Sequence, residues 1–272
     1  MLGNKAAVLE SLRQKITALE TNPLLKDAGV PVVSAGLLAT PRGSLHEVFA
    51  DSVRDSGAAL GFALAQARSQ IEASRPAVLF MQLEADALEV GLPYAHGLKS
   101  FGFDPERLVL VRPHTITELL WAIEEAIACR AVAAVVADIA YPHKALDFTA
   151  SRRLSLRAAA AGASVFLVRY GREREATAAK FRWKIVPQLS GAPPFDERAP
   201  GVPRWRVILE KGNLGRRRNA TPAGDEYLVD WTDNGFIPAN NDTSRDDAGV
   251  PRRPALPHAA PAALGDGLPQ TG

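Results

Sequence analysis

The sequence predicts an α/β protein built on a mostly parallel β-sheet with helices on both faces. Short, continuously apolar runs recur along the chain and are typical of strands covered on both sides. Segments with apolar residues at helical spacing separate these runs, as expected for strand–helix–strand crossovers. Nearer the C-terminus apolar and polar residues alternate, which favours antiparallel strands with one wetter face. We therefore expect a three-layer α/β core whose C-terminal strands are antiparallel.

The N-terminal segment predicts a short amphipathic helix over residues 4–20. Its spacing places four apolar side chains on one helical face, namely Val8, Leu12, Ile16 and Leu19. A link rich in Pro and Gly follows, and such residues interrupt regular structure. We therefore expect residues 1–22 to form a helical arm beside a main domain over residues 23–232.

Within the main domain, apolar runs and turn signals give the order of the elements. Expected buried strands cover residues 45–49, 77–83, 108–111, 131–137 and 164–169. Expected helices cover the segment from Leu60 to Ile71 and residues 93–101, 116–130 and 149–161. Thr115 and Glu118 form a capping box at the start of the third of these helices. Alternation predicts antiparallel strands over residues 181–186, 204–209 and 227–231.

The composition limits the classes of protein to which the chain can belong. No stretch approaches 18 consecutive apolar residues, and the first 20 residues carry charges throughout, so neither a membrane span nor a signal peptide is expected. A single cysteine, Cys129, fits a reducing compartment, and we expect a cytoplasmic protein. Beyond Thr232, six prolines and many small or polar residues predict a disordered tail over residues 233–272.

The stretch after the first strand has the outline of a phosphate-binding loop without its reactive residues. Such loops use a Gly-rich turn, a Lys for the terminal phosphates and a Ser or Thr hydroxyl for magnesium. Here the corresponding residues are Ser56, Gly57, Ala58 and Ala59, so the Lys and the hydroxyl are both replaced by Ala. Asp51 and Asp55 also place negative charge where phosphates would lie. We expect no NTP hydrolysis, no tight nucleotide binding and no cofactor, because phosphoryl transfer depends on positioned positive charge.

Motifs spread along the main domain resemble those of known proteins. Three of them, at Pro41–Val48, Gly102–Leu110 and Ala134–Asp138, resemble segments of the core of the recombinase RecA. Five, at Pro41–Val48, Asp104–Arg112, Glu118–Ala126, Thr149–Leu154 and Arg204–Val207, more closely resemble the ImuA family of RecA-like proteins. The likeness covers roughly residues 25–232 and implies a RecA-like fold.

The resemblance also implies a function and partners. ImuA-family proteins belong to a damage-inducible mutagenesis cassette, which implies a part in SOS-induced, error-prone translesion DNA synthesis. The implied partners are RecA, a catalytically defective Y-family polymerase-like protein and an error-prone replicative-type polymerase. The implied location is the cytoplasm, with this chain at the nucleoid during DNA damage. The main hypothesis is a non-enzymatic adaptor. The alternatives are a single-stranded-DNA-binding module, a weak ATP-binding RecA paralogue that uses a cation such as Arg54, and a cell-division inhibitor.

Two acidic residues follow predicted strands and are candidates for metal or catalytic groups. Asp138 ends a buried strand where a recombinase coordinates magnesium through water, but a carboxylate that caps a nearby turn is the simpler interpretation. Glu84 occupies a similar place, yet its distance in sequence from Gly102 does not fit the resemblance. The histidines show no short metal-ligand spacing. We therefore expect no catalytic residues and no metal site.

A basic segment over residues 171–218 is a candidate contact for single-stranded DNA. It holds twelve Lys and Arg against five Asp and Glu. Basic side chains neutralise phosphates, and aromatic rings such as Trp183 and Trp205 stack on bases. The alternative is a solvated outer face of the sheet, on which Arg alternates with apolar residues. The candidate contacts are Arg172, Arg174, Lys180, Arg216, Arg217 and Arg218.

Protein partners have two candidate contacts in the sequence. Trp121 is expected on the outer side of its helix with Glu124 and Glu125, where a Trp can anchor an interface. Leu12 and Ile16 of the N-terminal arm are the second candidate contact, because an amphipathic helix can dock on another protein. The alternatives are that a neighbouring segment covers Trp121 and that the arm folds back on its own domain.

Overall fold

The computed structural model describes residues 37–191, 199–214, 220–221, 224–232 and 235–239, all within one compact unit that ends at Ala239. The expected helical arm over residues 1–22 lies outside the described residues. So does the expected tail, except for residues 235–239 at its start.

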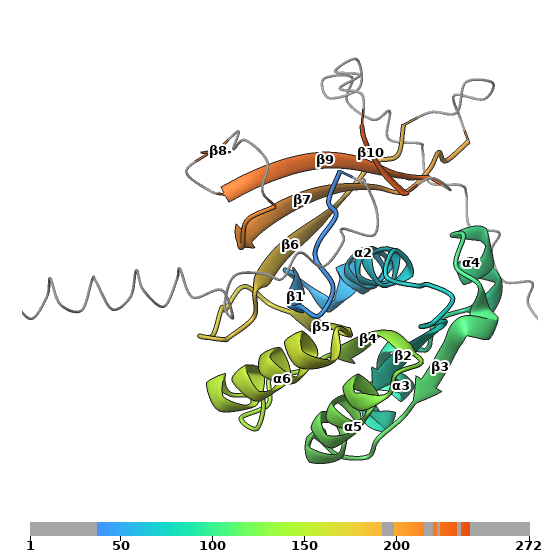
Figure 1. The fold of residues 1–272 in the computed structure, drawn as a ribbon. Helices are drawn as coiled ribbons and strands as arrows, with labels where there is room; N and C mark the ends of the chain where they lie inside the picture. Colours follow the sequence, from blue (N-terminus) through green and yellow to red (C-terminus); the bar gives the residue numbers. More distant parts are fainter. Residues whose placement is uncertain (1–36, 192–198, 215–219, 222–223, 233–234, 240–272) are drawn as a thin grey trace, which may run out of the picture. The chain divides into compact units, whose positions relative to one another are not determined.

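Six parallel strands form the centre of the sheet, in the order β3-β2-β4-β5-β1-β6 (Figure 1). They are β1 (Leu45–Ala50), β2 (Ala77–Gln82), β3 (Leu108–Val111), β4 (Val132–Ile139), β5 (Ser164–Tyr170) and β6 (Phe181–Gln188). The register places Gln82 opposite Asp138 on neighbouring strands, and Ala50 opposite Tyr170. Because the strands are parallel, these four residues share the carboxyl edge of the sheet.

Antiparallel strands extend the sheet beyond β6. They are β7 (Arg204–Lys211), β8 (Ala220–Thr221), β9 (Gly224–Thr232) and β10 (Gly235–Pro238). β6, β7, β9 and β10 pair in that order, and β8 pairs with β9 off this path. The expected antiparallel C-terminal strands are therefore confirmed.

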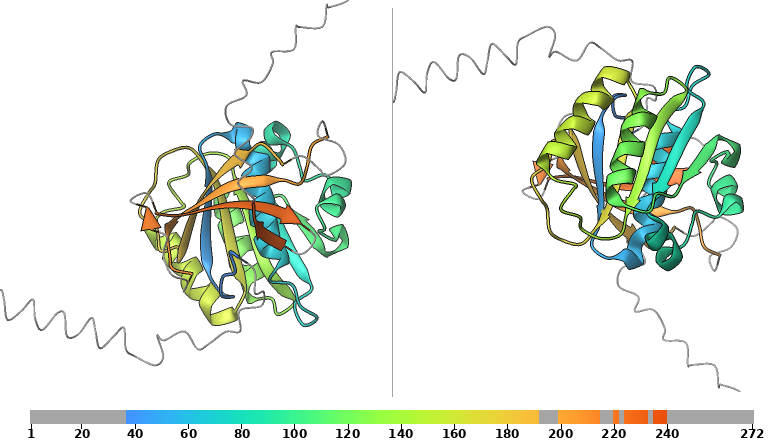
Figure 2. Two further views of the ribbon diagram at one scale, coloured as in Figure 1. Left: turned by 90° about the horizontal axis from the view of Figure 1, so that it is seen from above. Right: turned by 90° about the horizontal axis from the view of Figure 1, so that it is seen from below.

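Helices cover both faces of the parallel strands (Figure 2). On one face α5 (Ile116–Ala128) and α6 (Phe148–Ala161) pack side by side against β4, β2, β1 and β5. On the other face α2 (Ser56–Arg68) lies against β1, β4, β5 and β6. Side chains of β4 alternate between the two layers, since Val135 and Ala137 join the α5/α6 cluster whereas Ala134 and Val136 join the α2 cluster. The three-layer α/β fold expected from the sequence is thus confirmed.

Helix α2 is enclosed on a second side by the antiparallel strands. The ring of Phe62 lies 5.4 Å from that of Trp183 on β6 and 5.3 Å from that of Phe236 on β10. The ring of Trp205 on β7 comes so close to Gly61 that a Cβ there would lie 3.3 Å from it. A helix that is apolar around most of its circumference must be buried, and the Ala-rich sequence of α2 meets that condition.

Several elements differ from the sequence-based expectation, among them the short strand β8, which the sequence did not predict. A short helix, α3 (Glu84–Val90), follows β2 directly, and the expected helix over residues 93–101 is reduced to α4 (Ala95–Ser100). Strand β10 lies beyond Thr232, where the sequence predicted the tail to begin. The compact unit therefore continues past that boundary to Ala239.

Candidate functional site

The loop between β1 and α2 is short and closed by its own hydrogen bonds. Ser52 caps a single 3-10 turn over Val53–Asp55, because its side chain accepts a hydrogen bond from the Arg54 N–H at 3.2 Å. The Asp55 N–H donates to the Ser52 carbonyl at 3.0 Å. Helix α2 then begins at Ser56. This strand–turn–helix outline matches the one predicted from the sequence.

The four residues predicted to form the degenerate loop occupy the first turn of α2. Gly57 is exposed, and nothing lies within 4 Å of the position that a Cβ would take. Ala58 is half-buried, whereas Ala59 is fully buried in the core on the α2 side of the sheet. Neither Ala side chain offers a cation or a hydroxyl to an anion above the helix.

Beside this loop, an ion pair within the chain neutralises the positive charge of Lys184. Asp51 follows β1, and its Oδ2 accepts from Lys184 Nζ of the neighbouring strand β6 at 2.9 Å. Arg172 Nε lies 3.7 Å from the same oxygen. A phosphate group in this loop would have to compete with the Asp51 carboxylate for Lys184.

Asp138 lies buried at the carboxyl edge of the sheet, with both of its oxygens occupied. Tyr170 donates its hydroxyl to Oδ1 at 2.7 Å, and Gln82 donates its amide N–H to Oδ2 at 3.1 Å. Burial raises the pKa of the Asp138 carboxyl to about 6, and the nearby charge of Asp86 acts in the same direction against the two hydrogen bonds. At neutral pH the group is therefore mainly a carboxylate that accepts two hydrogen bonds.

The Tyr170 side chain links the end of β5 to the end of β4, where Asp138 lies. Its strand, β5, lies between β1 and β4, and its hydroxyl reaches across to the end of β4. Burial, followed by the adjacent Asp138 charge, raises the pKa of the Tyr170 hydroxyl above its usual range, so it remains a donor. A metal ion at Asp138 would have to bind the remaining lone pairs of a carboxylate that already accepts two hydrogen bonds. Among the described residues, no group of three or more His, Cys, Asp or Glu side chains is placed to hold a metal ion.

Glu84, the second acidic candidate, does not join this cluster. It begins α3, and its carboxylate contacts His114 Nδ1 at 2.6 Å. The adjacent acid Asp86 is the buried one, and it accepts a hydrogen bond from the Ala140 N–H at 3.2 Å. Glu84 is therefore a surface residue that links α3 to the segment after β3.

Three residues that shape the site were not assigned to it from the sequence: Gln82, Tyr170 and Lys184. Gln82 and Tyr170 each stand at the end of an apolar run, which is the signal that places a side chain at the carboxyl edge. Their contact with Asp138 depends on the order of β2, β4 and β5, and that order is not encoded by a local pattern. Lys184 reaches the loop because β6 pairs with β1.

The basic segment is partly tied into the domain. Arg174 forms a two-point ion pair with Glu210 on β7, with N–O distances of 2.8 and 3.2 Å. Arg172 and Lys180 are exposed, whereas Arg216, Arg217 and Arg218 lie outside the described residues. Stacking of Trp183 or Trp205 on a base, one of the two alternatives for this segment, does not fit the structure, because these rings are 0% and 4% exposed and belong to the core around α2.

A buried ionic network fixes the loop between β5 and β6. Glu47 of β1 is 1% exposed and accepts from Arg169, Arg182 and the Thr177 hydroxyl at 3.3, 2.9 and 2.7 Å. Arg169 also pairs with Glu175 in the loop at 2.8 Å. Glu175 and Thr177 of the loop thus bind the buried side chains of Arg169 and Glu47, and these contacts hold the loop against the sheet.

Trp121 projects from the outer side of α5 and is 65% exposed, so helix α4 does not cover it. Glu124 differs from expectation: it is buried and pairs with Arg153 and Arg157 of α6. Glu125 remains exposed. The outer side of α5 therefore presents Trp121 and Glu125, while Glu124 joins the two helices. The candidate arm contacts Leu12 and Ile16 lie outside the described residues.

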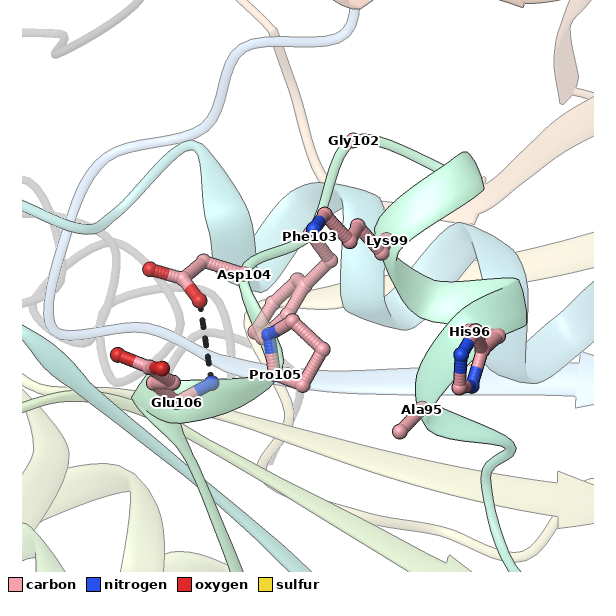
Figure 3. A pocket seen from close by; sticks show the side chains of 8 residues that line it. All are labelled: Ala95, His96, Lys99, Gly102, Phe103, Asp104, Pro105 and Glu106. Carbon is pink, nitrogen blue, oxygen red and sulfur yellow. Dashed lines mark hydrogen bonds between the residues drawn. The ribbon is translucent and has the colours of Figure 1, made fainter.

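A shallow hollow lies at the opposite edge of the sheet from Asp138. It is open to solvent and is lined by residues of α4 and of the turn that leads into β3 (Figure 3). Within it the Asp104 carboxylate accepts from the Glu106 N–H at 3.1 Å. The residues that line the hollow come before the amino end of β3 in the chain. None of them belongs to the cluster around Asp138 at the carboxyl edge of the sheet.

Comparison with known proteins finds two curated relatives, and no family model matches the chain. The relatives are proteins named ImuA from two strains of Caulobacter vibrioides, NA1000 / CB15N and ATCC 19089 / CIP 103742 / CB 15. Each is 36% identical over 188 residues, which is 65% of this chain and 72% of the relative. Separately, no described helix has the length and apolar character needed to cross a membrane. The match covers most of each relative and so extends well beyond any single motif.

Proposed function

The chain belongs to the ImuA family, and from that premise we propose that it is a non-enzymatic, RecA-like adaptor in SOS-induced, error-prone translesion DNA synthesis. Its partners in this role are RecA, a Y-family polymerase-like protein and an error-prone replicative-type polymerase. The protein acts in the cytoplasm, at the nucleoid during DNA damage. It uses a recombinase fold as a docking surface and needs no nucleotide.

The loop after β1 is the observation that carries the proposal. Ala58 and Ala59 stand in place of the Lys and the hydroxyl, and Asp51 neutralises Lys184 at 2.9 Å. Asp138 is already bonded to Tyr170 and Gln82. Phosphoryl transfer needs positioned cations and metal at the phosphates. This arrangement offers hydrogen-bonded carboxylates instead, which supports an adaptor over an NTPase.

Titration calorimetry with ATP and magnesium tests the absence of nucleotide chemistry. We expect no binding at micromolar concentrations and no phosphate release, with or without single-stranded DNA. Arg54→Ala is the diagnostic variant, because Arg54 is the exposed cation within the loop. Micromolar binding or DNA-stimulated turnover that this variant abolishes would establish a weak ATP-dependent RecA paralogue instead.

Co-precipitation with the full-length chain tests the partners. We expect capture of RecA and of the polymerase-like protein, and loss of one of them on Leu12→Asp with Ile16→Asp or on Trp121→Ala. Leu88→Ala is the control, because Leu88 is 85% exposed and belongs to a different helix, α3. Capture of neither protein by the unaltered chain contradicts the adaptor role. Equal capture by all variants excludes the arm and Trp121 as the contacts.

Binding of single-stranded DNA is the second candidate function, because Arg172 has a side chain that is 86% exposed beside the loop. Binding that rests on phosphate contacts weakens steeply with salt. Reversal of Arg172, Lys180 and Arg216–Arg218 to Glu should abolish it at low salt, whereas Arg107→Glu at the opposite edge should not. Undetectable binding, or binding that survives the reversal, removes this candidate.

A further inference from the structure

The two helices on the outer face of the sheet carry opposite charges. α5 has the sequence ITELLWAIEEAIA, with three Glu and no Lys or Arg. α6 has the sequence FTASRRLSLRAAAA, with three Arg and no Asp or Glu. The helices lie side by side, so acidic and basic side chains come from opposite halves of this face.

Only part of this charge is used within the chain. Glu124 pairs with Arg153 and Arg157 across the line between the helices. Glu118 caps the start of α5 and accepts from the His114 N–H at 2.9 Å. Glu125 of α5 and Arg152 of α6 are exposed and form no ion pair among the described residues. One acid and one base thus remain available on the two halves of the face.

Large apolar side chains stand among these charges. Trp121 is 65% exposed, Leu156 is 63% exposed and Phe148 is 49% exposed. Trp121 and Glu125 are four residues apart on α5, as are Phe148, Arg152 and Leu156 on α6, so each set shares a helix face. No other described helix or strand covers this side of the molecule (Figure 2). Exposed apolar groups rimmed by charge mark interaction surfaces.

We propose that the occupant of this face is a second copy of the chain, docked through a two-fold axis that sets α5 of one copy on α6 of the other. A two-fold interface is self-complementary, so each residue pair occurs twice. The acidic half then meets the basic half in both places, and Glu125 faces Arg152 of the partner subunit. Trp121 and Leu156 supply the apolar centre that such an interface needs.

The choice of occupant rests on charge complementarity. An acidic partner would satisfy α6 and repel α5, and a basic partner would do the reverse. A second copy rotated by 180° satisfies both helices at once. The proposal goes beyond the adaptor role and does not rest on it. Because Trp121 is also a candidate contact for RecA or the polymerase-like protein, binding of either protein there and formation of this dimer would exclude each other.

Sedimentation velocity of the full-length chain over a range of concentrations tests the dimer. We expect a reversible monomer–dimer equilibrium. Glu125→Arg and Arg152→Glu should each raise the dissociation constant roughly tenfold, since each places like charges together twice. The double variant should restore the original value. Trp121→Ala should raise the dissociation constant about a hundredfold or more, and Leu88→Ala should leave it unchanged.

Tryptophan fluorescence gives a second readout. Trp183, Trp205 and Trp231 are at most 5% exposed, so Trp121 dominates quenching by iodide. We expect quenching to fall as the chain concentration rises. Three results would overturn the proposal: a monomer at every concentration up to ~200 µM, a dimer insensitive to the Trp121 and charge variants, or a Trp121 already shielded in the monomer, which would mean that another part of the same chain covers it.

Discussion

At the scale of single residues, Asp138 makes the stability of the fold depend on pH. Its pKa of about 6 lies above the ordinary 3.8, so the folded state holds the proton more tightly than the unfolded state does. The stability from this group is therefore present below pH 4 and is lost as pH rises through 6. A shift of this size corresponds to about 3 kcal/mol.

The variant Asp138→Asn isolates this effect. We expect the unfolding free energy of the unaltered chain, minus that of the variant, to fall by about 3 kcal/mol between pH 3 and pH 7.5. Urea titrations at several pH values measure it. Burial lowers the pKa of His46 to about 3. The contribution of His46 to the stability of the fold is therefore lost as pH falls, opposite to that of Asp138. It is common to both chains and cancels. Parallel pH profiles would contradict the burial of Asp138.

Glu47 makes a second prediction at this scale. Glu47→Ala removes the carboxylate shared by Arg169 and Arg182, whose side chains are 8% and 13% exposed. Uncompensated buried charge should cost about 3–5 kcal/mol of unfolding free energy. Glu175→Ala removes a partner of Arg169 that is 52% exposed and should cost under about 1 kcal/mol. Equal costs in chemical denaturation would show that Glu47 is not the centre of the network.

The residues that the sequence alone identified are those defined by a local motif. The missing Lys and hydroxyl were readable at Ala58 and Ala59, because the motif fixes their spacing from Gly57. Tyr170 and Lys184 were not readable, because their contacts depend on which strands become neighbours. The fate of Trp183 was misjudged for a related reason. An alternating strand shows two faces, and only the packing of α2 determines which face is buried.

At the scale of elements, α2 is the centre of the larger core. Leu64 on this helix is 2% exposed, so Leu64→Ala should leave a cavity and cost about 2–5 kcal/mol of unfolding free energy. Leu88→Ala makes the same chemical change on α3 at a site 85% exposed, and it should change stability by less than about 0.5 kcal/mol. Thermal unfolding of both variants checks this. A small effect at Leu64 would mean that its side chain is not packed in the core around α2.

Element prediction succeeded where hydrophobic patterns were long. The eight strands expected from the sequence are all present, because continuous or alternating apolar runs over four or more residues mark burial clearly. α3 was missed because seven residues with two buried side chains give too short a pattern. β10 was missed because the Pro- and polar-rich sequence around it is typical of a tail, and its strand form depends on pairing with β9.

At the scale of the whole molecule, the carboxyl edge of the sheet differs from the face formed by α5 and α6. The carboxyl edge, where related folds bind ligands, is closed by bonds among Asp51, Lys184, Asp138 and Tyr170. The α5/α6 face is open and divided by charge. This contrast is the reason for placing function in contacts with other chains rather than in chemistry at the strand ends.

The frequency of mutation after DNA damage, measured in cells that lack the protein, tests this account most directly. Deletion should reduce damage-induced mutation, and the unaltered chain should restore it. Arg54→Ala should restore it equally well, because a non-enzymatic adaptor does not need the exposed cation of its loop. An unchanged mutation frequency after deletion would contradict the role in translesion synthesis. Failure of Arg54→Ala to restore mutation, with the variant folded and present at normal levels, would contradict the absence of nucleotide chemistry.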